Sequence, residues 1–89
     1  MKRLALVCPH VQTGERAVAW AIRNEPVGPM DSGWQFLCTP GEMGDVRAFG
    51  TWTIARVVEE EPSLGPHIDS PLGTTLQKEP GLARWHRWR

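Results

Sequence analysis

Glycine and proline are so frequent in this chain that its helices and strands have to be short. Nine glycines and eight prolines occur among only 89 residues, and both residue types interrupt regular elements. A chain of this length forms one domain at most, which excludes a doubly wound nucleotide-binding fold or a catalytic barrel. We therefore expect residues 1–89 to form a single small domain with many loops.

The charges balance over the whole chain but not along it. Ten Lys and Arg residues match ten Asp and Glu residues, which removes the electrostatic reason to expect a general nucleic-acid or membrane-surface binder. Residues 1–24 carry +3 (four basic, one acidic), residues 25–62 carry −5 (two basic, seven acidic) and residues 63–89 carry +2 (four basic, two acidic). The acidic middle segment is suited to a basic partner.

Neither end of the sequence indicates export or a membrane span. The apolar run from Leu4 to Cys8 follows two basic residues, but it is shorter than the ~7–15 residues of an export signal. We expect it to be a buried first strand of a cytoplasmic protein without membrane contact. Cys8 and Cys38 are too few for a disulfide framework, and we expect two buried thiols, which lie close together if their strands are neighbours.

The hydrophobic pattern predicts an α+β fold. In chain order, the expected elements are a strand at 4–7, a turn at 9–14, a strand at 16–23, a turn at 31–33, a strand at 34–37, a loop at 40–50, a helix ending at 61, and a hairpin formed by 74–78 and 82–88. This order predicts a mainly antiparallel sheet of about five strands with one helix packed on a face.

Local residue choices support the elements in the middle of the chain. Trp34 and Phe36 are two residues apart and therefore share one face of a strand. Asp31 can form an Asx-turn, and Gly33 can adopt a positive φ. Thr51 or Thr53 can cap the helix, which Pro62 stops.

Candidate metal ligands and nucleophiles are present, but their spacing is weak. Five residues could ligate zinc, namely Cys8, His10, Cys38, His67 and His86. Only Cys8 and His10 are close in sequence, whereas a strong zinc signal has paired ligands such as C-x2-C. Ser32 or Cys38 with His67 and Asp69 would supply a nucleophile, a base and an orienting acid, but no nucleophile elbow surrounds them. We therefore expect no metal, no cofactor and no enzyme activity.

The C-terminal residues offer an alternative function. Residues 84–89 read Arg-Trp-His-Arg-Trp-Arg, and these side chains can contact phosphates and stack on bases. A nucleic-acid-associated accessory domain would need this tail to share one face with Lys2, Arg3 and Arg16. The same residues also fit a closing strand in which one tryptophan covers the core.

Several motifs in the right order resemble one known family. They are Arg23-Asn24-Glu25-Pro26, Asp31-Ser32-Gly33-Trp34-Gln35-Phe36, Gly41-Glu42, Thr53-Ile54-Ala55 and Ser70-Pro71-Leu72-Gly73. Together they resemble the immunity protein thirty-three family, a small bacterial domain first catalogued as a domain of unknown function. The resemblance runs from about Leu4 to Leu82. It implies a protein that binds and neutralises a bacterial toxin, although some members are orphan domains.

An immunity protein needs a rigid scaffold with a charged or aromatic patch rather than a catalytic site. We predict that the patch consists of residues in the loops around the third strand, with one more acidic residue nearby. These are Glu25, Asp31, Trp34, Glu42 and Asp69. For Trp34, an alternative is that it packs in the core and holds the Asp-Ser-Gly turn.

Overall fold

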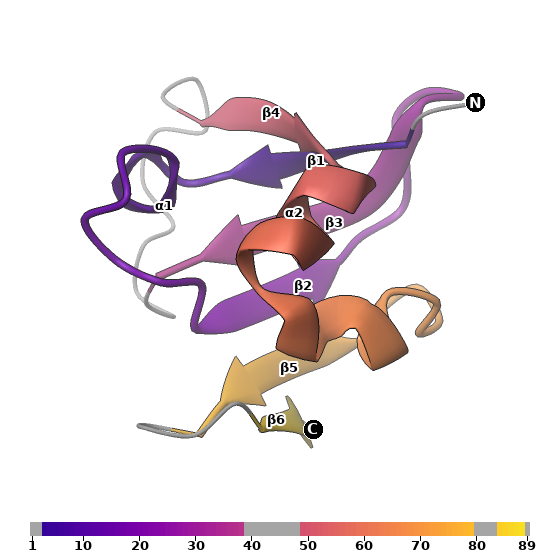
Figure 1. Cartoon of the computed structure of the whole chain (residues 1–89). Helices are drawn as coiled ribbons and strands as arrows, with labels where there is room; N and C mark the ends of the chain where they lie inside the picture. Colours follow the sequence, from indigo (N-terminus) through magenta and orange to yellow (C-terminus); the bar gives the residue numbers. More distant parts are fainter. Residues whose placement is uncertain (1–2, 39–48, 80–83, 89) are drawn as a thin grey trace.

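Within the residues that the structure describes, six strands form one mixed sheet with three short helical segments on one of its faces (Figure 1). The computed structural model describes residues 3–38, 49–79 and 84–88. The strands are β1 (Leu4–Val7), β2 (Trp20–Arg23), β3 (Asp31–Leu37), β4 (Gly50–Thr53), β5 (Thr75–Lys78) and β6 (Trp85–Trp88). The helices are α1 (Pro9–Gln12), α2 (Ile54–Glu60) and the 3-10 helix η2 (Pro62–His67).

The strands lie in the order β4-β1-β3-β2-β5-β6. Strands β1 and β3 are parallel, and the other four neighbouring pairs are antiparallel. The α+β class and a mainly antiparallel sheet are thus confirmed, and the described residues hold one strand more than the about five expected, with the short helices α1 and η2 besides the predicted helix. The additional strand is β4, whose β-prone residues Thr51 and Trp52 pair with the edge of β1 before the chain turns into α2.

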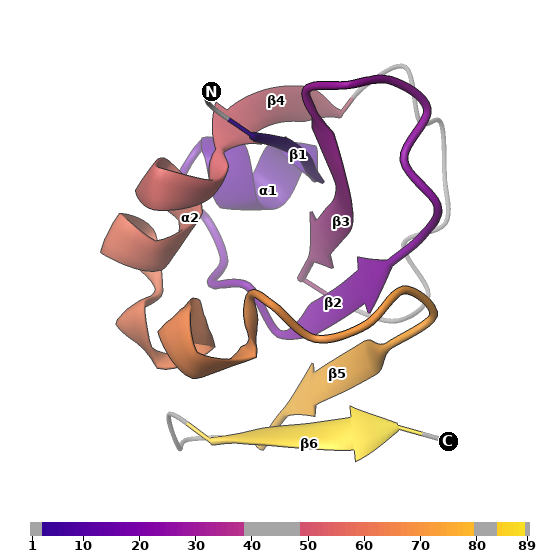
Figure 2. The same cartoon turned by 90° about the vertical axis from the view of Figure 1, so that its right-hand side faces the viewer.

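The strand register aligns a row of core residues on one face of the sheet. Val7, Phe36, Ala21 and Leu76 are aligned across β1, β3, β2 and β5, and all four are buried. Figure 2 shows α1, α2 and η2 along this side of the sheet. Trp34 points to the same face two residues before Phe36, and their rings stack with centroids 5.5 Å apart. The predicted shared face of these two aromatic residues is therefore confirmed.

Several predicted elements are confirmed with shifted boundaries. The strand at 4–7 and the closing hairpin of β5 and β6 are present, and the Thr53 hydroxyl caps α2 by accepting a hydrogen bond from the Arg56 amide. The second strand begins at Trp20 rather than at residue 16. Residues 9–14 contain the short helix α1, because Pro9 is favourable at a helix start.

The predicted turn at residues 31–33 is wrong, since these residues belong to β3. Their turn chemistry appears instead as an irregularity in the strand pairing: the register between β1 and β3 shifts between Leu4 and Leu6. Gly33 has a φ of 83° at this position, which a β-bulge accommodates. Most of the loop predicted at 40–50 lies outside the described residues.

Among the residues that the structure describes, no helix is both long and apolar enough to cross a membrane.

Candidate functional site

Arg23 connects, through hydrogen bonds, the segments that carry the predicted patch. It lies at the end of β2, where its Nε donates to the Ser32 carbonyl at 3.0 Å and its Nη1 donates to the Ser70 carbonyl at 2.7 Å. The guanidinium also lies 5.8 Å from the centre of the Trp34 ring. The end of β2, the start of β3 and the segment after η2 are therefore held at one end of the sheet.

Asp31 shapes the connection between β2 and β3. Its Oδ1 accepts a hydrogen bond from the Gly33 amide and its Oδ2 accepts one from the Val27 amide, each at 2.9 Å. The neighbouring Ser32 is buried, and its hydroxyl donates to the Leu4 carbonyl at 2.7 Å. Both side chains thus hold backbone groups in place. The hydroxyl of Ser32, which the sequence analysis considered as a nucleophile, is used in this backbone hydrogen bond.

Three of the predicted carboxylates gather where β1 and β3 begin and β2 ends. Glu25 follows β2, Asp31 opens β3, and Asp69 forms an ion pair of 3.5 Å with Arg3, which directly precedes β1. We call Glu25, Asp31 and Asp69 the acidic end. Glu42, the fourth predicted carboxylate, lies outside the described residues.

Trp34 lies beneath the acidic end rather than on its surface. Its side chain is 1% exposed, and its Nε1 donates to the Ile68 carbonyl at 2.9 Å. The core position considered as the alternative for this residue is the one observed. Trp34 thereby fixes the segment that carries Asp69 against β3.

Exposed apolar side chains, which the sequence did not single out, surround the acidic end. Within the described residues, the large hydrophobic side chains that are exposed are Val27 (95%), Leu72 (52%) and Met30 (44%). Val27 and Met30 lie between Glu25 and Asp31 in the chain. Leu72 lies beside β2, because the next residue, Gly73, donates its amide to the Arg23 carbonyl.

A hollow of about 190 Å³ connects these apolar and acidic groups, and its lining includes Glu25, Val27 and Asp31. A second hollow of about 210 Å³ shares Val27 and Asp31 and extends over Leu4 and Leu6. The signal in the sequence was an apolar residue, Val27, placed between Pro26 and Gly28, where a loop offers little to pack against.

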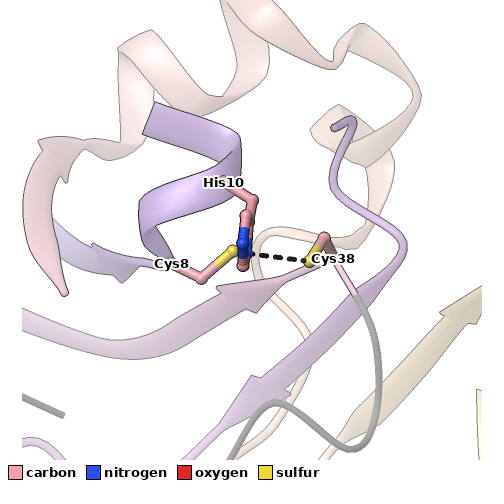
Figure 3. Close-up of side chains that lie close together, drawn as sticks. All are labelled: Cys8, His10 and Cys38. Carbon is pink, nitrogen blue, oxygen red and sulfur yellow. Dashed lines mark hydrogen bonds between the residues drawn. The ribbon is translucent and has the colours of Figure 1, made fainter. Parts of the chain in front are cut away.

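The structure also brings together three of the five candidate metal ligands. Donor atoms of Cys8, His10 and Cys38 all lie within 4.8 Å of one another. Figure 3 shows these three side chains close together, two of them at the start of α1 and the third just after β3. His67 lies in η2, and His86 lies in β6, where its Nε2 is 3.4 Å from a Glu79 carboxylate oxygen. The imidazole beside Cys38 is that of His10, at 3.7 Å from Nδ1 to Sγ, and not that of His67, which the sequence analysis considered with this cysteine.

Two of the described basic groups that nucleic-acid binding would need on one face, Arg3 and Arg16, lie apart. Arg3 precedes β1 and Arg16 follows α1, so they lie beyond opposite ends of β1. Trp85 is buried, with its Nε1 donating to the Ser63 hydroxyl at 2.8 Å. Residues 85–88 form the strand β6, and Trp85 is consequently not available to stack on a base.

Comparison with known proteins gives one match. A family model described as the immunity protein Imm33 domain matches residues 6–89, nearly the whole chain. No curated protein and no solved structure matches.

Proposed function

Because the chain belongs to the Imm33 immunity protein family, we propose that it is a small non-catalytic domain that binds and neutralises a bacterial toxin. We further propose that the acidic end, with Val27, Met30 and Leu72, is the surface that contacts the toxin. Glu42, which lies outside the described residues, stays part of the predicted patch on the sequence alone.

The observation that carries the proposal is the coincidence of exposed apolar and acidic side chains at one end of the sheet. Protein interfaces combine a few anchoring apolar side chains with a polar rim. Val27 has its side chain almost fully in solvent, and exposing it gives a monomeric domain no benefit in stability. A partner that covers Val27 would remove this apolar surface from water.

The backbone beneath this surface is well fixed, which favours tight binding. Asp31 accepts two backbone hydrogen bonds across the loop. Arg23 donates to the carbonyls of Ser32 and Ser70 and so links the start of β3 to the segment before Leu72. A surface that is ordered before binding loses little conformational entropy on association. Carboxylates at its rim favour a partner with lysine or arginine at the matching positions.

The proposal is tested by capture and by toxicity. The tagged chain is used as bait in a lysate of its native host, and each enriched protein is then expressed in a heterologous bacterium. We expect one captured protein to stop growth when expressed alone, and co-expression of the wild-type chain to restore growth. The double variant Glu25→Lys/Val27→Asp should neither capture this protein nor restore growth.

Glu15→Lys is the matched control, because Glu15 is an exposed carboxylate in the connection after α1, beyond the opposite end of β1. It should capture the toxin and restore growth as the wild type does. Equal protection by the Glu25→Lys/Val27→Asp variant would contradict the surface assignment. If no captured protein impairs growth, the immunity role itself is contradicted.

A further inference from the structure

We propose that Cys8, His10 and Cys38 bind Zn²⁺ through two sulfur atoms and one imidazole nitrogen. The proposal starts from distance. The three donor atoms lie within 4.8 Å of one another, and the Nδ1 of His10 is 3.7 Å from the Sγ of Cys38. With Zn–S of about 2.3 Å and Zn–N of about 2.0 Å, neighbouring ligand atoms in a tetrahedral zinc site are about 3.5–3.8 Å apart.

The fold, rather than sequence spacing, brings the ligands together. Strands β1 and β3 are parallel with Val7 opposite Phe36, and the Cys8 amide donates to the Phe36 carbonyl at 3.1 Å. Cys8 and Cys38 therefore leave the same end of two neighbouring strands. The C-x2-C spacing of common zinc sites is absent because this site draws its sulfurs from two strands.

Helix α1 places the third ligand. The Cys8 carbonyl accepts hydrogen bonds from the amides of Val11 and Gln12, so Cys8 is the N-cap and His10 lies in the first turn of α1. The imidazole consequently points back toward the two sulfurs, as Figure 3 shows. The ligands are held by backbone hydrogen bonds before any ion binds, which lowers the entropic cost of binding.

The surroundings suit a thiolate-bound cation. Cys8 and Cys38 are 0% and 7% exposed, whereas His10 is half-buried and gives access from solvent. The Nη1 of Arg16 lies 3.8 Å from the Cys38 sulfur. The guanidinium donates a hydrogen bond to this sulfur and would act as an outer donor to the ligand once an ion is bound.

Two thiolates would neutralise the charge of Zn²⁺ inside this partly buried site, and sulfur with imidazole is a donor set that zinc prefers. The cluster within the described residues supplies three ligands. A tetrahedral site needs one ligand more than these three.

The test uses the full chain, purified under reducing conditions and freed of its tag and of metal. Titration with Co²⁺ should give one bound ion per chain and the near-ultraviolet absorption of cobalt–thiolate bonds, and Zn²⁺ should displace it. At 100 times its dissociation constant, Zn²⁺ should raise the thermal midpoint by about 15 °C.

His10→Ala is the main variant, since a half-buried side chain can be removed with less risk to folding than Cys8. It should weaken Zn²⁺ binding by about tenfold or more, and Cys38→Ser should weaken the cobalt–thiolate absorption, since only the Cys8 sulfur remains. His86→Ala is the matched control and should bind as the wild type does. The proposal is overturned if the reduced chain binds no ion, if His10→Ala binds Zn²⁺ unchanged, or if a Cys8–Cys38 disulfide forms and the re-reduced protein still takes up no ion.

Discussion

At the scale of single residues, Gly33 occupies a backbone position that suits no other residue type. Its φ is 83°, and a Cβ added to it would collide with the carbonyl oxygen of Asn24. In Gly33→Ala, the alanine would have to adopt a left-handed backbone conformation, and its Cβ would clash beside the acidic end. We expect it to lower the free energy of unfolding by about 3 kcal/mol, measured by urea denaturation.

Gly14 provides the control, because its φ is 80° but a Cβ there would have no atom within 4 Å. Gly14→Ala should lower the free energy of unfolding by about 1 kcal/mol, the cost of the backbone conformation alone. Equal losses in the two variants would show that the loop carrying Asn24 moves aside without cost.

Properties that belong to one residue were predictable from the sequence, and properties that depend on distant residues were not. The positive φ of Gly33 and the Asx-type hydrogen bond of Asp31 follow from their own chemistry. That they lie in a strand depends on pairing with β1, far away in the chain. The exposure of Val27 could not be predicted either, because it depends on which other segments pack against this loop in the folded protein.

At the scale of elements, Glu61 joins the helices to the sheet. Its Oε1 accepts from the Lys78 ammonium of β5 at 2.7 Å, and its Oε2 accepts from the Ser63 hydroxyl at 2.6 Å. The side chains of Lys78 and Glu61 are only 20% and 13% exposed. Glu61→Ala leaves the ammonium without this partner, and we expect a loss of about 2–3 kcal/mol in the free energy of unfolding.

Chemical denaturation of Glu61→Ala beside Glu59→Ala measures this contribution. Glu59 is an exposed carboxylate of α2, the helix that ends just before Glu61, and its removal should change the free energy of unfolding by less than about 0.5 kcal/mol. A similarly small change for Glu61→Ala would mean that water replaces the carboxylate around Lys78.

Elements defined by local signals were predictable, whereas those created by pairing were not. Thr53 and Pro62 bracket α2 in the sequence, and they bracket it in the structure. Strand β4 has four residues and exists through its pairing with β1. The same is true of the Cys8–His10–Cys38 cluster, because its ligands meet through the parallel pairing of β1 and β3.

At the scale of the whole molecule, the order of strands in the sheet departs from their order in the chain. Strand β2 pairs with β3 and β5 rather than with β1, which lies between β3 and β4. Strands that follow one another in the chain are expected to pair as hairpins, and β2 with β3 and β5 with β6 do so. The parallel pair of β1 and β3 could not be predicted this way, although it positions both the acidic end and the cysteines.

Strand β6 closes one edge of the sheet, and its removal tests whether residues 84–89 are structural or an accessory tail. Trp85 is 7% exposed and lies opposite Lys78 in β5. Deleting residues 84–89 loses this burial, which for a tryptophan costs about 3 kcal/mol or more. In a domain of this size we expect the thermal midpoint to fall by about 10 °C or more, followed by circular dichroism.

Trp85→Phe separates the two contributions of the strand. It keeps an apolar ring but loses the hydrogen bond from Nε1 to the Ser63 hydroxyl, so the midpoint should fall by only about 5 °C. An unchanged midpoint after the deletion would make residues 84–89 dispensable for folding. Their arginines and tryptophans would then be free to bind nucleic acid, and the alternative function would gain the tail that it requires.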